Sequence, residues 1–195
     1  GQGNAASVKR TVTVVDTTAP VLTLVGDANV THEGGTTYTD AGATVADIAD
    51  VDVKVVVAGT VDITQLGDYT LAYDATDASG NKATQLSRKV TVVDTVAPVI
   101  TLKGAAETTV IQDGDFTDPG STAVDAVEGD LSSQVAVGGD NVDTATLGEY
   151  VITYDVSDSQ GNKAVQVTRK VIVTNAPDTT LPVITLVGDA TISSE

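Results

Sequence analysis

The chain has 195 residues, of which 41% are hydrophobic and 3% are aromatic, and it contains no Cys, Met or Trp. With 27 acidic and 10 basic residues it carries a formal net charge of −17, which repels the phosphates of nucleic acids and anionic membrane surfaces. The absence of Cys excludes disulfides and Cys-based zinc sites, and no apolar run reaches the length of a membrane-spanning helix.

A repeated sequence organises the whole chain. The segment Asp-Thr-Thr-Ala-Pro-Val at 16–21 recurs in altered form 78 residues later, at 94–99, and again 84 residues after that, at 178–183. Between these copies, Leu-Gly-Asp-Tyr at 66–69 corresponds to Leu-Gly-Glu-Tyr at 147–150, at an offset of 81 residues. Self-similarity at a fixed period is typical of tandem-repeat proteins.

The phase of this repeat divides the chain into four parts. We expect the last strand of a preceding repeat at 1–15, complete repeats at 16–93 and 94–177, and the first strand of a following repeat at 178–195. The incomplete ends have two explanations: the chain is a segment of a longer array, or its end strands complete neighbouring subunits by strand donation. We favour the first, because a domain assembled only from the two ends would lack its middle strands.

Strand patterns recur within each repeat. Residues 69–77 alternate between two faces, the turn sequence Ala-Ser-Gly-Asn follows at 78–81, and residues 86–93 alternate again. These segments predict a β-hairpin. Short strands rich in β-branched residues, Gly- and Asp-rich turns and the lack of a helical period predict an all-β fold of immunoglobulin-like β-sandwich repeats arranged end to end.

One tyrosine in each repeat has the position of a tyrosine corner. Tyr69 precedes the inward-facing Leu71 by two residues, and Tyr150 precedes Ile152 in the same way. In immunoglobulin-type sandwiches a Tyr at this spacing ties the start of a strand to the backbone before it. The spacing therefore favours an immunoglobulin-type sandwich.

Three motifs together resemble bacterial surface immunoglobulin-like repeats. They are the linker motif Asp-Thr-x-Ala-Pro-Val-x-Thr-Leu-x-Gly, the related segments at 38–42 and 116–120, and the hairpin motif Asp-x-x-Gly-Asn. The motifs are also loosely similar to hyalin repeats and cadherin modules. This resemblance implies tandem arrays in large secreted or surface-attached proteins, where such repeats serve as stalks, adhesins or matrix components. The first repeat departs from the pattern at 50–52, where the second has the more typical Glu-Gly-Asp.

Acidic residues gather where the linker enters each predicted sandwich. Of the 27 acidic residues 22 are Asp, which shapes turns and also binds cations. Carboxylates that converge without Lys or Arg favour a hard cation, so we predict Ca²⁺ at the repeat junctions. The predicted ligands are Asp16, Asp47, Asp50, Asp52, Asp77 and Asn81 in the first repeat, and Asp94, Asp125, Glu128, Asp130, Asp158 and Asn162 in the second. The alternative is that these residues only shape turns, and no EF-hand spacing is present.

Each repeat also contains an arginine at an inward-facing strand position. These are Arg88 and Arg169, and Asp40 and Asp118 recur at matching positions. Because a partly buried Arg needs a partner, we predict structural ion pairs rather than a binding site. The sequence shows no nucleophile–base pair and no phosphate loop, so we predict that the chain is not an enzyme.

The predicted function is structural. We expect a calcium-stiffened stalk or spacer of an adhesin-like protein that is secreted or attached to the cell surface, with neighbouring repeats of the same chain as partners. An alternative is the building repeat of an extracellular filament or matrix fibre, in which other copies are also partners. A ligand- or carbohydrate-binding module is disfavoured, because the aromatic residues recur at positions expected in the core and the repeats are near-duplicates.

Overall fold

The computed structural model describes residue 3, residues 6–185 and residue 187. Regular structure in this part of the chain is almost entirely β-strand, and the one helical element there is the short 3₁₀ turn η1, Ser132–Gln134. No helix among these residues is long and apolar enough to cross a membrane. The all-β expectation is therefore confirmed.

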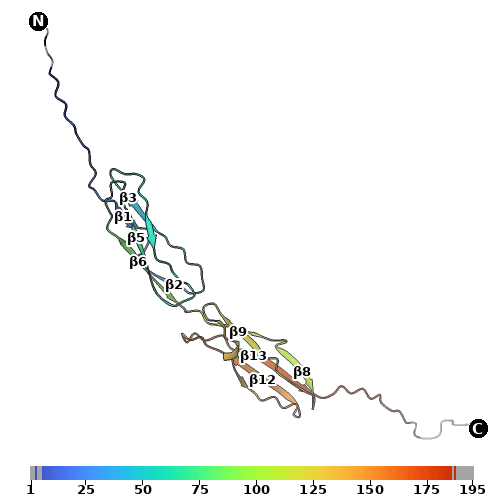
Figure 1. The fold of residues 1–195 in the computed structure, drawn as a ribbon. Coiled ribbons are helices and arrows are strands. Elements are labelled where there is room, and N and C mark those ends of the chain that lie inside the picture. Colours follow the sequence, from blue (N-terminus) through green and yellow to red (C-terminus); the bar gives the residue numbers. More distant parts are fainter. Residues whose placement is uncertain (1–2, 4–5, 186, 188–195) are drawn as a thin grey trace, which may run out of the picture. The chain divides into compact units, whose positions relative to one another are not determined.

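Two compact units make up the chain (Figure 1). The first contains residues 1–98 together with the two short segments 124–129 and 157–162, and the second contains the remaining residues. Each repeat contributes two sheets, which is the layer pattern of a β-sandwich.

The first repeat has six strands. They are β1 (Val21–Leu24), β2 (Asn29–Glu33), β3 (Ala43–Ala46), β4 (Val56–Ala58), β5 (Gly67–Asp74) and β6 (Leu86–Val93). β1 and β3 pair antiparallel in one sheet. The other sheet has the order β2-β6-β5-β4, in which β2 runs parallel to β6 and the other neighbours are antiparallel. Strands β2 and β4 are thus its edges.

The second repeat has seven strands. They are β7 (Val99–Leu102), β8 (Glu107–Ile111), β9 (Ser121–Asp125), β10 (Gly129–Asp130), β11 (Ala136–Gly139), β12 (Gly148–Asp155) and β13 (Val167–Thr174). The smaller sheet has the order β10-β9-β7 and the larger β11-β12-β13-β8. Because β8 runs parallel to β13 while β11, β12 and β13 are antiparallel, the larger sheets of both repeats share one topology.

The core of each repeat follows the two-residue period of its central strands. Leu71 and Tyr73 of β5 are buried, and so are Arg88, Val90 and Val92 of β6. A fully buried aliphatic side chain of this size contributes roughly 1.5–3 kcal/mol. The equivalent buried residues of the second repeat are Ile152, Tyr154, Arg169, Val171 and Val173. Each core therefore includes one arginine among apolar neighbours.

The hairpin and the tyrosine corner are also confirmed. Leu71 lies opposite Arg88 in the antiparallel pairing of β5 with β6. The turn after β5 uses Gly80 at φ 89°, a left-handed conformation that favours glycine. At the corner, the Tyr69 hydroxyl donates to the Gln65 carbonyl at 2.8 Å, and Tyr150 makes the equivalent bond four residues upstream at 3.0 Å.

The two ends of the chain contain no assigned strand where they are described, at 6–20 and 175–185. The expected strands at 1–15 and 178–195 extend beyond these ranges, and residues 1–2, 4–5, 186 and 188–195 lie outside the described residues. The assignment of these ends to neighbouring repeats stays a prediction.

Candidate metal centres

Two groups of three aspartates bring carboxylate oxygens within 4.8 Å of one another. The first group, cluster 1, is Asp16, Asp47 and Asp77, and the second, cluster 2, is Asp94, Asp125 and Asp158. In cluster 2, Asp94 directly follows β6, Asp125 ends β9, and Asp158 lies in the turn after β12. All members of cluster 2 belong to the first compact unit, because it includes the segments 124–129 and 157–162.

Turn geometry accounts for only part of the oxygens in cluster 2. Oδ1 of Asp94 accepts the Val96 N–H at 3.2 Å, and Oδ1 of Asp125 accepts the Val127 N–H at 2.7 Å. The Oδ2 atoms of Asp94 and Asp125 are buried and have no hydrogen-bond partner in the described part of the chain. Asp94 is 8% exposed and Asp125 is 4% exposed, so water does not satisfy these oxygens freely. An unpaired buried carboxylate oxygen is costly, and a cation would remove that cost.

The third aspartate of cluster 2 is held by an asparagine. Asp158 accepts the Asn162 N–H at 2.8 Å on Oδ1 and the Asn162 side-chain amide at 2.7 Å on Oδ2. The same amide group donates to the backbone carbonyl of Asp94 at 3.2 Å. Asn162 therefore presents its nitrogen to these acceptors and positions two members of the cluster.

Cluster 1 has the same design with less burial. Asp16 and Asp47 are half-buried and Asp77 is buried. Asp47 uses Oδ1 to accept the Ala49 N–H at 2.8 Å, while its Oδ2 is a buried oxygen without a partner among the described residues. Asn81 donates to Asp77 and to the Asp16 carbonyl, as Asn162 does in cluster 2.

The electrostatics of cluster 2 favour a bound cation. Burial raises the pKa of Asp94, and the neighbouring charges of Asp125, Asp158 and Glu33 raise it further against the lowering effect of the Val96 N–H. None of the salt bridges found among the described residues includes a member of either cluster. Hard divalent cations with oxygen ligands fit this set of carboxylates, and Ca²⁺ tolerates flexible carboxylate geometry.

Four other predicted ligands lie outside the two groups. Glu128 accepts the Ser159 N–H at 2.9 Å, and Asp130 accepts the Ser132 N–H at 2.9 Å. Asp50 and Asp52 have the corresponding places in the first repeat, where Asp50 Oδ2 accepts the Ala78 N–H at 2.9 Å and the Asp52 N–H donates to Asp50 Oδ1. These contacts hold loops around the clusters, and the role of the four residues as calcium ligands stays a prediction.

Glu33 is a contributor that the sequence pattern did not identify. Its carboxylate accepts both the backbone N–H and the hydroxyl of Thr95, each at 2.8 Å, one residue after Asp94. The equivalent position in the second repeat is Ile111, so a search for residues that recur in both repeats does not find Glu33. Its only mark in the sequence is this difference between the repeats. Glu33 therefore fixes the linker beside cluster 2.

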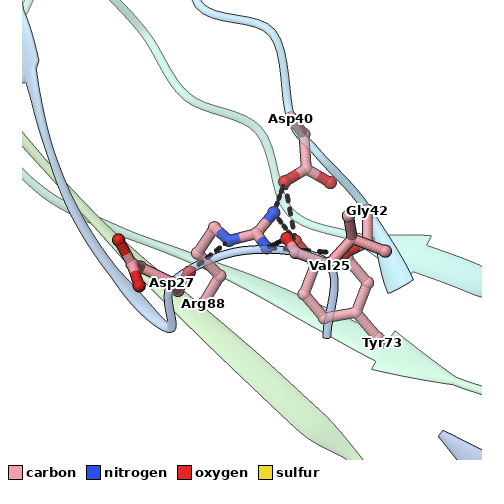
Figure 2. Close-up of polar contacts among 6 residues, drawn as sticks. All are labelled: Val25, Asp27, Asp40, Gly42, Tyr73 and Arg88. Carbon is pink, nitrogen blue, oxygen red and sulfur yellow. Dashed lines mark hydrogen bonds and ion pairs between the residues drawn. The ribbon is translucent and has the colours of Figure 1, made fainter. Parts of the chain in front are cut away.

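Away from the clusters, the buried Arg88 is joined to Asp40 by a salt bridge (Figure 2). The Tyr73 hydroxyl donates to Asp40 at 2.8 Å and accepts from Arg88 Nη1 at 3.0 Å, so the three side chains form one network. Burial raises the pKa of Tyr73 to about 12, with a further contribution from its bond to Asp40. Burial also acts to raise the pKa of Asp40, but the bonds from Tyr73, the Gly42 N–H and Arg88 outweigh it and lower that pKa.

The second repeat contains the same kind of network. Arg169 Nε lies 3.0 Å from Asp118 and donates to the Tyr154 hydroxyl at 3.2 Å. Tyr154 in turn donates to Asp118 at 2.7 Å. Each tyrosine therefore hydrogen-bonds to both members of the ion pair in its repeat. The sequence pattern predicts these tyrosines only as core residues. The signal for their second role was the inward strand position, because a buried Tyr hydroxyl usually has a partner.

Comparisons with known proteins identify related sequences and structures. Residues 22–92 and 100–173 each match the family described as "Bacterial surface protein, Ig-like domain". The chain is 31% identical to hyalin of Strongylocentrotus purpuratus over 201 residues, which is 96% of this chain and 16% of that protein. It is 27% identical over 187 residues to an uncharacterized 81.3 kDa protein of Acholeplasma phage L2, covering 90% of this chain and 25% of that protein.

Solved structures that match parts of this chain include a lipoprotein of Bacteroides thetaiotaomicron and the EC1-2 fragment of human protocadherin-24. The lipoprotein is 26% identical with a TM-score of 0.37, covering 44% of this chain and 41% of the other. The protocadherin fragment is 14% identical with a TM-score of 0.37, covering 82% and 99%. The chain spans a quarter or less of the length of the curated relatives it matches. Because the two family matches cover most of its residues, the chain belongs to the bacterial surface protein Ig-like domain family and carries two such domains in tandem.

Proposed function

We propose that these repeats are a calcium-stiffened stalk or spacer of an extracellular or cell-surface protein. The family match supports a structural repeat of a surface protein, and hyalin is a relative over nearly the whole chain. In this proposal the repeats themselves perform no catalysis. Calcium is the component that gives the stalk its stiffness.

The observation that carries this proposal is the pair of unsatisfied oxygens in cluster 2. Oδ2 of Asp94 and Oδ2 of Asp125 are buried without partners. One carboxylate oxygen from each of these residues and one from Asp158 lie within 4.8 Å of one another. A turn needs only the Oδ1 atoms, which are already bonded. A cation held by the Oδ2 atoms explains why the carboxylates are buried together.

The mechanism of stiffening is restriction of the linker. Asp94 lies directly after β6, and Pro98 restricts the backbone four residues later. An ion bound by cluster 2 would join this linker to the end of β9 and to the turn after β12. Glu33 already restrains the linker through its hydrogen bonds to Thr95, so the ion would add a second restraint to the same linker.

The energy of each site is modest and accumulates along an array. Extracellular calcium modules bind with Kd of about 10⁻⁴–10⁻³ M. At about 1 mM free Ca²⁺, a site at the tight end of this range adds roughly 1.4 kcal/mol of stability. Each ion also compensates part of the net charge of −17, which otherwise expands the chain.

Calorimetric titration with Ca²⁺ tests the proposal. We expect saturable binding to the wild-type protein and its loss at one site in Asp94→Asn. Asp27→Asn is the matched control, because the Asp27 side chain is exposed and makes no hydrogen bond with any described residue. Absence of calcium binding by the wild type would reject the proposal.

Small-angle scattering tests the stiffening separately. We expect the profile of the wild-type protein to change to that of a less flexible particle when calcium replaces chelator, at constant mass. Superimposable profiles would show that calcium binding, if present, does not stiffen the chain. An increase in mass with calcium would instead favour the filament, in which copies of the chain associate.

A further inference from the structure

The buried arginines of the two repeats differ in how fully their hydrogen-bond donors are used. In the first repeat every side-chain nitrogen of Arg88 has an acceptor (Figure 2). Nε donates to the Asp27 carbonyl at 2.9 Å, Nη1 donates to Asp40 and Tyr73, and Nη2 donates to the Val25 carbonyl. This guanidinium has no nitrogen left for another molecule.

Arg169 leaves one nitrogen without an acceptor. Nε contacts Tyr154 and Asp118, and Nη2 donates to the carbonyls of Lys103 at 2.7 Å and Gly120 at 3.1 Å. Nη1 has no hydrogen-bond partner among the residues that the structure describes, and it is not one of the buried side-chain atoms without a partner, so solvent reaches it. An N–H group of a cation that the protein itself does not use is available to a ligand that reaches it.

A cavity of about 500 Å³ borders Arg169. It lies at β8, which is an edge strand of the larger sheet of the second repeat. Thr108, Thr109 and Thr117 line it, and none of their hydroxyls is hydrogen-bonded to another described residue. The half-buried Phe116 adds an aromatic surface to the lining.

The first repeat has a smaller version of this cavity. It measures about 210 Å³ beside Arg88, at the edge strand β2. Val30 replaces Thr108 in its lining, and Thr39 is the counterpart of Thr117. Space, hydroxyls and a free donor therefore coincide only in the second of these two cavities.

The charges around the larger cavity favour a neutral ligand. Asp118 already balances Arg169, and the exposed carboxylate of Asp115 is also in the lining. The net charge of −17 further opposes an anion. The lining offers an N–H donor, hydroxyls that donate or accept, a carboxylate acceptor and one aromatic surface. This combination matches a small molecule that carries several hydroxyl groups on a compact ring.

We propose that the second repeat binds a neutral saccharide unit in this cavity, with Arg169 Nη1 donating to a sugar oxygen. Thr108, Thr109 and Thr117 provide the remaining polar contacts, and Phe116 lies beside the apolar face of the ring. Such a site goes beyond the stalk function, and its lining includes no member of the calcium clusters. The surface repeat would then contact glycans along its side.

Amide chemical shifts of the ¹⁵N-labelled chain test this proposal. The probes are glucose and N-acetylglucosamine, with glucuronic acid as the anionic comparator, each in calcium and in chelator. We expect saturable shifts at 108–117 with a neutral sugar, a millimolar Kd and no change at the equivalent 30–39. Because no calcium ligand is in the cavity, the same shifts are expected in both buffers, so this result does not depend on the stalk proposal.

Matched variants test the assigned contacts. Thr117→Val removes one exposed hydroxyl and is expected to weaken sugar binding about fivefold, the effect of one hydrogen bond. Thr39→Val is the same change in the first repeat and is expected to leave binding unchanged. The proposal is overturned if no neutral sugar gives saturable shifts, if both repeats respond equally, or if glucuronic acid binds more tightly than glucose.

Discussion

Replacing Asp125 by Asn separates the effect of charge from that of turn shape. Asn retains Oδ1, so it still accepts the N–H groups of Val127 and Glu128, which lie 2.7 and 3.0 Å from this atom in the wild type. The change removes one of three converging carboxylates. It also replaces the unpartnered Oδ2 with an NH₂ group, which puts a hydrogen-bond donor in place of an acceptor within the cluster.

The expected effect changes with calcium. Two unit charges 4.8 Å apart, the upper limit of the separations between ligand oxygens in cluster 2, repel by about 3.5 kcal/mol at an effective dielectric constant of ~20. The raised pKa of Asp94 means that proton binding relieves part of this repulsion at lower pH. We therefore expect Asp125→Asn to increase the free energy of unfolding by about 1–3 kcal/mol in chelator. In ~1 mM Ca²⁺ this advantage decreases by about 1.4 kcal/mol, because the variant loses a ligand.

Thermal unfolding in chelator and in calcium measures both quantities. For domains of this size, 1 kcal/mol corresponds to a shift in Tm of about 4–8 °C. Asp27→Asn removes the same charge from an exposed side chain and is expected to change Tm little in either buffer. If Asp125→Asn destabilises the protein equally with calcium and with chelator, the cluster only shapes turns and the reasoning is refuted.

Three further outcomes follow from the same contacts. Arg169→Ala is expected to lower the free energy of unfolding by roughly 1–3 kcal/mol in urea titrations, because Asp118 is left without its salt bridge, and an unchanged value would contradict this. The raised pKa of Asp94 predicts two effects in the pH range between its unfolded value of 3.8 and its higher value in the folded protein. Without calcium, the contribution of this carboxyl to the free energy of unfolding decreases as the pH rises. The calcium affinity measured by calorimetry decreases as the pH falls. Unchanged affinity across that window would argue against Asp94 as a ligand. Glu33→Ala is expected to accelerate hydrogen exchange of the Thr95 amide, which loses its acceptor, and an unchanged exchange rate would show that Glu33 does not hold the linker.

The fold could be predicted because the signals that specify it are periodic. Alternation along 69–77 identified the inward-facing Leu71 and Tyr73, and the repeat offset transferred the same assignment to the second repeat. The position of Tyr69 was sufficient to predict its corner, since that bond is made to the backbone only four residues away. Local periodicity was therefore sufficient to predict most of the architecture.

The site could be predicted only in part, because a sequence does not show which atoms remain unpaired. Asp125 and Asp130 were both predicted as ligands. Asp125 belongs to cluster 2 and has a buried oxygen without a partner among the described residues, while Asp130 lies outside the cluster and accepts the Ser132 N–H. The contact between Glu33 and Thr95 joins residues far apart in the chain, and no recurring motif marks it. Both differences are set by tertiary placement rather than by residue type.

The chain contains two arrangements for buried carboxylates, and the contrast between them supports an exchangeable cation. Asp40 and Asp118 each have an arginine partner from the larger sheet of their repeat, and this arginine is almost fully buried. Asp94 and Asp125 are at least as buried and have no basic partner among the described residues. A fixed arginine would neutralise cluster 2 under all conditions. Without one, the proposed calcium ion would supply the neutralisation, and the stability and stiffness of the linker would then follow the calcium concentration.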